Sequence, residues 1–202
     1  MKTAERIRTR IKETPLGEPF TPAAFLELGT RATVDQTLSR LAKEGFIMRV
    51  SRGVFVRPEE SRFVSNIAPE PSKIAEAIAK TTGATIQVHG AEAARRLSLS
   101  TQTPTQPVFY TSGPSKHIRV GNLMVTLKHT CPRKLALAGR PAGLALAALW
   151  YLGKAEVTEM VIEKIRQKLS PEEFLALKSA TASMPAWMTD VLYKYERNTR
   201  ND

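Results

Sequence analysis

Side chains that commonly carry metal or nucleophilic chemistry are scarce in this chain of 202 residues. Cys131 is the only cysteine, which excludes an internal disulfide and a thiolate cluster for zinc. Three aspartates, Asp35, Asp190 and Asp202, are spread along the chain. Metal-assisted chemistry on nucleic acids needs two or more converging carboxylates. We therefore expect no metal site of this kind.

Other catalytic arrangements are also missing from the sequence. His89, His117 and His129 lack the spacing of zinc ligands. Cys131 and His129 are close enough in sequence to form a nucleophile and base, but a structural thiol is the alternative that we favour. Neither of the glycine-rich phosphate loops, GxxxxGK[ST] or GxGxxG, occurs. The sequence thus predicts no catalytic residue, no cofactor and no enzyme activity.

Long apolar runs are absent as well. The best candidate, residues 141–153, is shorter than the roughly 18 residues that a membrane span needs, and is typical of a buried helix. Residues 1–13 contain no apolar core of the kind found in signal peptides. We expect a cytoplasmic protein without a membrane partner.

Positive charge, by contrast, is abundant. The net charge is +11 and the isoelectric point is about 10.0. Residues 1–62 contribute +4 (12 basic, 8 acidic), residues 63–140 contribute +7 (10 basic, 3 acidic), and the remainder is neutral. A basic balance of this size favours polyanionic partners, through electrostatic steering and counterion release.

The first sixty residues have the pattern of a winged helix-turn-helix. Apolar residues three and four apart predict a helix over residues 4–13. Thr21-Pro22 opens a short helix that ends at Gly29, and its apolar residues Phe25, Leu26 and Leu28 can face a core. A third helix follows, which Thr33 and Gln36 could cap, and it ends at Gly45. Two β-rich stretches around residues 51–53 then predict a hairpin. We place this DNA-binding domain at residues 1–62.

In such a domain the third helix lies in the major groove and the hairpin meets phosphates or the minor groove. The side chains that we expect to contact DNA are Arg31, Thr33, Gln36, Thr37, Arg40 and Lys43 on the helix, and Arg49, Ser51 and Arg52 at the hairpin. Arginine pairs with guanine edges and glutamine with adenine edges. Asp35 and Glu44 on the same helix count against DNA binding, and the alternative is a module that docks a protein.

The rest of the chain predicts a mixed α/β domain that ends in several helices, so that the fold class is α+β. Residues 63–72 are the expected linker and residues 73–202 the second domain. Ser170, Pro171 and Glu173 have the pattern of a helix N-terminus. The expected helices cover residues 73–82, 91–97, 144–152, 153–169, 170–182 and 186–198. The expected strands cover residues 84–88, 108–112, 116–120 and 123–129. Turns are expected at Gly113-Pro114 and Gly121-Asn122.

The middle of the chain carries basic residues with almost no acidic ones among them. The predicted second basic surface consists of Lys73, Arg95, Arg96, Lys116, Arg119 and Lys128. Three interpretations stay open: a second DNA contact surface, a docking face for an acidic partner or RNA, or a solvated face without a partner.

Two segments, SRGVFVRP at residues 51–58 and the run from Ile74 to Gly113, resemble the shared region of AbiEi-type antitoxins, the partners of nucleotidyltransferase-like toxins in abortive-infection systems. The resemblance covers about residues 4–150, and this chain has His89 where many relatives carry proline or serine. It implies a winged helix followed by an α/β domain, binding to double-stranded DNA at an inverted repeat in the protein's own promoter, and neutralisation of a toxin from the same operon. Direct contact with that toxin is left open. The alternative is an interaction module or a general regulator without a toxin partner.

Overall fold

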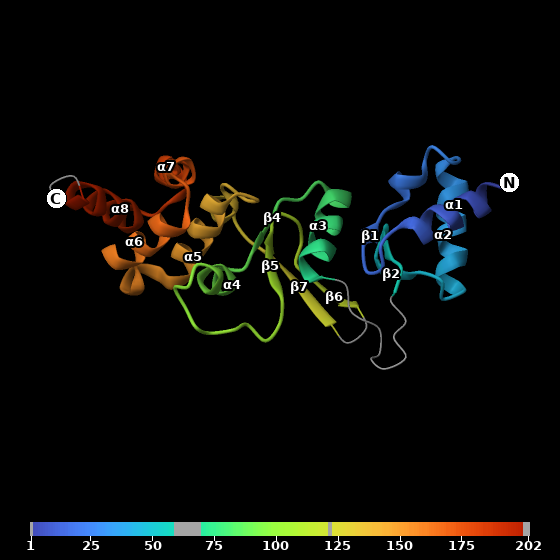
Figure 1. Cartoon of the computed structure of the whole chain (residues 1–202), viewed down its shortest axis with the longest axis horizontal. Helices are drawn as coiled ribbons and strands as arrows, with labels where there is room; N and C mark the ends of the chain where they lie inside the picture. Colours follow the sequence, from blue (N-terminus) through green and yellow to red (C-terminus); the bar gives the residue numbers. More distant parts are fainter. Residues whose placement is uncertain (1, 59–69, 121–122, 200–202) are drawn as a thin grey trace. The chain divides into compact units, whose positions relative to one another are not determined.

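The computed structural model describes residues 2–58, 70–120 and 123–199 of an α+β protein. The chain divides into two compact units (Figure 1). Unit 1 comprises Met1–Ala84 and Lys116–Thr126, and unit 2 comprises Thr85–Ser115 and Leu127–Asp202. The predicted domains, 1–62 and 73–202, differ from this division because residues 71–82 and 116–126 group with unit 1.

Unit 1 begins with three helical segments around an apolar core. They are α1 (Thr3–Glu13), the 3₁₀ helix η1 (Pro22–Phe25) and α2 (Arg31–Lys43). Apolar residues three and four apart on α1 and α2 are buried together with aromatic rings from the connecting segments. This core contains Ile7, Ile11, Phe20, Phe25, Val34, Leu38, Leu41, Ile47 and Phe55.

Three local expectations for this region need correction. The N-cap of α2 is Thr30, whose hydroxyl accepts a hydrogen bond from the Thr33 N–H, so the expected box of Thr33 and Gln36 is wrong. Leu26, expected to face the core, is exposed because the short segment after Thr21 is a single 3₁₀ turn that buries Phe25 instead. The sequence also gave no sign of a strand at residues 19–20.

The expected hairpin is present. It consists of β2 (Met48–Ser51) and β3 (Val54–Val56), and β1 (Pro19–Phe20) pairs with the other edge of β3, giving an antiparallel sheet in the order β1-β3-β2. The register shifts between Arg49 and Ser51, and Gly53 turns the chain with a φ of +73°. A non-glycine residue rarely adopts that angle, so the turn depends on glycine.

The remaining elements of unit 1 are α3 (Pro71–Thr82), β6 (Lys116–Val120) and the beginning of β7 (Leu123–His129). α3 contacts β1 and β3, and β6 contacts β2. Pro71 stands in the first turn of α3, where its missing N–H costs nothing. The helix therefore begins two residues before the expected start. Residues 63–69 of the predicted linker, and the predicted turn at Gly121-Asn122, lie outside the described residues.

A second sheet has the strand order β4-β5-β7-β6. β4 (Ile86–Val88) pairs antiparallel with β5 (Val108–Thr111), with Ile86 opposite Thr111 and Val88 opposite Phe109. All four strands were predicted within two residues of their ends, because β-branched and aromatic residues alternate there between turn residues.

Unit 2 is mainly helical. Its helices are α4 (Gly90–Arg96), α5 (Pro141–Glu156), α6 (Glu159–Lys168), α7 (Pro171–Ser179) and α8 (Ala186–Thr199), with 3₁₀ turns η2 (Pro132–Leu135) and η3 (Thr181–Ser183). Figure 1 shows α5 to α8 gathered in orange and red. The Ser170 hydroxyl accepts from the Glu173 N–H, which confirms the predicted cap of α7. The expected continuous helix over residues 153–169 is wrong, because Val157 is extended and α6 begins only at Glu159. Gly153, with a φ of +74°, lies at the expected boundary between residues 152 and 153.

α4 and α5 pack with unusually little side-chain volume between them. Alanines from both helices are completely buried in their interface, among them Ala93, Ala94 and Ala145. A Cβ placed on Gly90 would lie 2.3 Å from the Tyr151 Cβ, and one on Gly143 would lie 2.0 Å from the Leu137 carbonyl oxygen. Both distances are well inside van der Waals contact. The approach of α4 to α5 therefore requires glycine at position 90, and the approach of α5 to the Leu137 backbone requires glycine at position 143.

Candidate nucleic-acid interface

A groove of about 580 Å³ runs between α2 and the β2–β3 hairpin. Its basic lining residues are Arg31 and Lys43 from α2, and Arg49 and Arg52 from the hairpin. Among the described lining residues, Asp35 is the one carboxylate. Four cations against one anion, on two elements that line the same groove, give it a strongly positive charge.

On the α2 side of the groove, Arg31, Asp35, Ser39 and Lys43 form a row of residues four apart, and Ala42 lies beside them. Four residues are slightly more than one helical turn, so this row stays on one side of the helix. Asp35 and Ser39 were not predicted to belong to the site, although this spacing would have identified them.

The predicted contact residues of α2 do not all share that side. Arg40 comes nine residues after Arg31, about two and a half turns, so the two side chains leave the helix in opposite directions. Thr33, Gln36 and Arg40 are exposed but do not line the groove. The exposed face of α2 therefore extends from Arg31 round to Arg40, with Gln36 and Lys43 between them.

Thr37 is the one predicted contact residue that the structure removes from this surface. Its side chain is only 5% exposed and its hydroxyl donates a hydrogen bond to the Thr33 carbonyl at 2.8 Å. It stands in the buried row with Val34, Leu38 and Leu41. Threonine commonly satisfies its hydroxyl in this way within a helix, which lets it replace an apolar residue in the core.

Ion pairs moderate the charge of α2. Arg31 donates to Asp35 at 2.9 Å and Arg40 lies 3.6 Å from Glu44. These pairs are four residues apart and well exposed, so each stabilises the helix by only about 0.3–0.5 kcal/mol. A phosphate can therefore compete for the arginines at little cost. Within the described part of the chain, Lys43 and Arg52 have no carboxylate at ion-pair distance.

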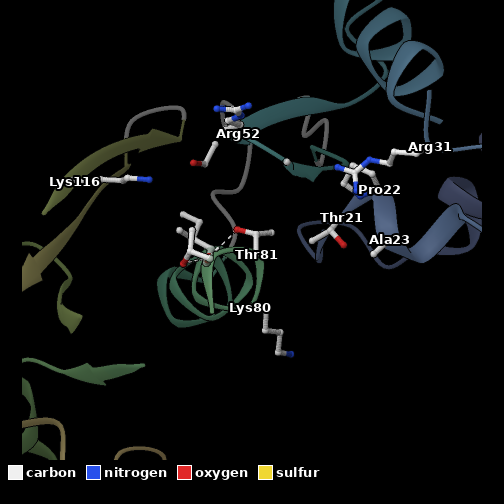
Figure 2. A pocket seen from close by; sticks show the side chains of 12 residues that line it. Thr21, Pro22, Ala23, Arg31, Arg52, Lys80, Thr81 and Lys116 are labelled. Atoms are coloured by element: carbon white, nitrogen blue, oxygen red, sulfur yellow. Dashed lines mark hydrogen bonds between the residues drawn. The ribbon is translucent and has the colours of Figure 1, made fainter. Parts of the chain in front are cut away.

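A second cleft, of about 740 Å³, adjoins the groove within unit 1. Figure 2 shows Arg52 and Lys116 on one side of it, Arg31 and Pro22 on another, and Lys80 and Thr81 from α3. Ser51, predicted as a hairpin contact, lines this cleft rather than the groove. Lys80 was not predicted to belong to a site, because its place depends on how α3 packs beside the hairpin.

The predicted second basic surface is more fully paired than the sequence suggested. Lys73 forms an ion pair with Glu18 that raises the pKa of the lysine, chiefly through the hydrogen bond between them. Arg95 and Arg96 both donate to Glu92. Lys116 and Arg119 are exposed on β6 in unit 1, whereas Lys128 belongs to unit 2. The expectation of an almost unopposed basic face is therefore wrong for Lys73, Arg95 and Arg96.

Glu92 should make folding stability dependent on pH. Hydrogen bonds from Arg95, and then from Arg96, lower the pKa of its carboxyl from 4.5 to about 2 against the opposing effect of burial. A depressed pKa contributes stability above the unfolded value and loses it as the pH falls toward the folded value. Glu92→Gln should therefore cost about 1–2 kcal/mol at pH 7, after discounting for the exposure of both guanidinium groups.

Urea unfolding of the parent and of Glu92→Gln at pH 7, 5 and 3 measures this effect. The difference in unfolding free energy should shrink between pH 5 and pH 3. A difference that stays constant over this range would show that the carboxylate charge is not its source.

His89 caps α4 in unit 2. The Ala91 N–H donates to the His89 Nδ1 at 3.2 Å, and the ring lies 4.8 Å from that of Tyr110. Burial, followed by the charges of Lys128 and Lys134, lowers the pKa of this histidine. A neutral ring with Nδ1 accepting explains how histidine serves as an N-cap here.

The described residues, 2–58, 70–120 and 123–199, offer little other candidate chemistry. In these ranges no group of three or more His, Cys, Asp or Glu side chains is placed to hold a metal ion. Cys131 is exposed and free. None of the described helices is long and apolar enough to cross a membrane.

Three comparisons relate the chain to known proteins. Residues 6–177 match the model of DUF6088, described as a family of unknown function. None of the curated proteins matches the sequence. Among solved structures, the crystal structure of the RV2827C protein from Mycobacterium tuberculosis is similar, with 15% sequence identity and a TM-score of 0.48 over 96% of this chain and 82% of the other.

Proposed function

The chain belongs to the DUF6088 family, and from its own residues we propose that it is a DNA-binding autorepressor and an antitoxin. In this proposal α1, η1 and α2, with the β1-β3-β2 sheet, form a winged helix-turn-helix. α2 is the recognition helix, and the hairpin of β2 and β3 is the wing.

The observation that carries the DNA-binding part is the basic groove between α2 and the hairpin. Arg31, Lys43, Arg49 and Arg52 line one opening, in which Asp35 is the one carboxylate among the described lining residues. A recognition helix and a wing that are both basic would neutralise phosphates on either side of the helix as it enters the major groove. The buried row on α2 holds the helix against α1 and η1 and leaves its opposite face free.

Within this arrangement the exposed side chains take different roles. Gln36 stands near the middle of the free face, where its amide can pair with an adenine edge, and Arg40 beside it can pair with guanine. Arg49 and Arg52 on the wing are suited to phosphates, which carry no sequence information. A winged helix of this kind commonly binds an inverted repeat as a dimer.

The antitoxin part rests on the resemblance of residues 51–58 and 74–113 to AbiEi-type antitoxins. We propose that the partner is a nucleotidyltransferase-like toxin encoded in the same operon, and that the protein itself is not an enzyme and needs no cofactor. We assign neutralisation to residues beyond the winged helix, since the resemblance is most specific there.

One double variant tests both parts of the proposal. Gln36→Ala combined with Arg40→Ala removes two base-reading candidates whose side chains are exposed, so the fold should be retained. We expect at least a tenfold loss of preference for the DNA upstream of the gene over a scrambled duplex, since a bidentate base contact contributes about 1–3 kcal/mol. The same variant should still rescue growth when the neighbouring toxin is expressed.

Fluorescence anisotropy on the two duplexes and a co-expression growth assay provide the measurements. Gln167→Ala with Arg197→Ala removes the same side-chain types from exposed positions on α6 and α8, and should leave DNA binding unchanged. An unchanged preference in the Gln36/Arg40 variant would contradict the recognition-helix assignment. Failure of the parent chain to rescue growth would contradict the antitoxin role.

A further inference from the structure

The second cleft of unit 1 has a composition that the recognition helix and wing do not explain. Its four cations come from four separate elements: Arg31 from α2, Arg52 from the hairpin turn, Lys80 from α3 and Lys116 from β6. No carboxylate is among its described lining residues. Hydroxyl groups of Thr21, Ser51, Thr81 and Thr82 complete the polar lining.

We infer that this cleft binds the sugar–phosphate backbone of the same DNA duplex, beyond the segment that α2 and the wing contact. Lys80 and Lys116 then add two phosphate contacts that contribute affinity without sequence preference. This inference rests on the proposed DNA-binding function and extends its footprint to α3 and β6.

Continuity with the groove is the first argument. The cleft and the groove share four lining residues, Pro22, Arg31, Arg52 and Gly53. A chain of phosphates that leaves the groove past Arg31 and Arg52 therefore enters the cleft directly. A small free anion would need only one of the two openings, whereas a polymer occupies both.

The state of the two lysines is the second argument. Lys80 and Lys116 are exposed, and in the described part of the chain neither has a carboxylate at ion-pair distance. Lys73, on the same helix as Lys80, is held by Glu18 instead. An ammonium group is a compact charge that binds phosphate oxygens through mobile donors. These lysines are therefore available to a phosphate, while their neighbour is not.

The packing around Lys80 supplies the third argument. Ile74 and Ile78 bury the inner face of α3, and the hydroxyls of Thr81 and Thr82 bond to carbonyls of the helix's last turn. The contacts of α3 with β1 and β3, together with the ion pair between Lys73 and Glu18, hold this helix beside the hairpin. The elements that form the cleft are thus held in place by contacts other than those of its lysines.

The test is the salt dependence of binding to a random-sequence duplex. Each lost phosphate contact reduces the slope of log affinity against log salt by about 0.9. Lys80→Ala with Lys116→Ala should therefore reduce the slope by about 2 and the affinity by roughly tenfold or more at 0.1 M salt. It should weaken binding to the upstream duplex by the same factor, so that the preference between duplexes stays constant.

Two control variants accompany it. Lys80→Arg with Lys116→Arg keeps the charge and should keep the parent slope, and a slope that falls equally in this variant overturns the inference. Lys154→Ala with Lys168→Ala removes two exposed charges from α5 and α6 and should also keep the slope. Circular dichroism confirms that each variant is folded.

The outcomes separate the possibilities. An unchanged slope in the Lys80/Lys116 alanine variant overturns the inference, whether or not Gln36 and Arg40 determine sequence preference. A second outcome also overturns the inference. If calorimetry shows that the parent binds a nucleoside triphosphate, and the alanine variant loses this binding but keeps the DNA slope, the cleft is a site for a free nucleotide. A reduced slope together with an ineffective Gln36/Arg40 variant supports the cleft and rejects the recognition-helix assignment.

Discussion

Reversing the charge of Arg31 and Arg52 together should abolish binding to duplex DNA at physiological salt. These two arginines line both the groove and the second cleft. Exchanging them for glutamate changes the local charge by four units, so two attractive phosphate contacts become repulsive. Loss of two contacts alone lowers affinity by one to two orders of magnitude, and repulsion raises the expected loss to roughly 1,000-fold.

This loss should come from binding and not from unfolding. The Arg31 side chain is 61% exposed, and its exposed ion pair with Asp35 contributes only a few tenths of a kcal/mol. Thermal melting should therefore change little. Lys154→Glu with Lys168→Glu makes the same change in net charge on unit 2, and we expect less than about a threefold effect from long-range electrostatics at 0.15 M salt. Equal losses in both variants would mean that net charge, and not this surface, determines binding.

Adding a single methyl group at Gly143 should strongly destabilise the protein. The new Cβ would lie 2.0 Å from the Leu137 carbonyl oxygen, 2.5 Å from its carbon and 2.8 Å from the Gln87 Nε2. Two of these atoms are backbone, and Leu137 already has a φ of +58°, so the segment before α5 cannot easily move away. We expect Gly143→Ala to cost about 3 kcal/mol or more, at the upper end for overpacked sites.

Gly29→Ala is the matched control for this prediction. There the Cβ would lie 2.8 Å from the Thr3 Cγ2, the end of a side chain that can rotate. The cost should be below about 1 kcal/mol, because Gly29 does not need a positive φ. Chemical denaturation of both variants measures the difference. Similar stability of the two would show that the segment at Leu137 yields more readily than its backbone geometry implies.

Helix and strand positions were largely predictable, because periodicity and caps act locally. Val34, Leu38 and Leu41 identified the buried side of α2, and Ser170 with Glu173 identified the start of α7. The break near Val157 was missed because the apolar and charged residues on either side fit a helix equally well. The break lies at Val157, whose backbone is extended, and α6 begins at Glu159.

The side chains that share a surface were less predictable. Thr37 was selected for its polar hydroxyl, although it lies three residues after Val34 and four before Leu41 and so belongs to the buried side of α2. Arg31 and Arg40 were grouped by charge, although helical geometry alone would have separated them. Lys80 and Lys116 come together only because α3 and β6 both pack near the hairpin, which depends on tertiary contacts between different elements.

The division of the chain has a consequence for its synthesis. The backbone crosses between the two units at residues 84–85, 115–116 and 126–127. Unit 1 therefore cannot be complete until residue 126 has left the ribosome, by which time much of unit 2 has also been made. A nascent or truncated chain that stops before β6 lacks Lys116 and the strand that contacts β2. Such a product carries α2 and the β2–β3 hairpin without the rest of unit 1. Under the proposed function, we therefore expect it to bind DNA more weakly than a chain that extends beyond residue 126.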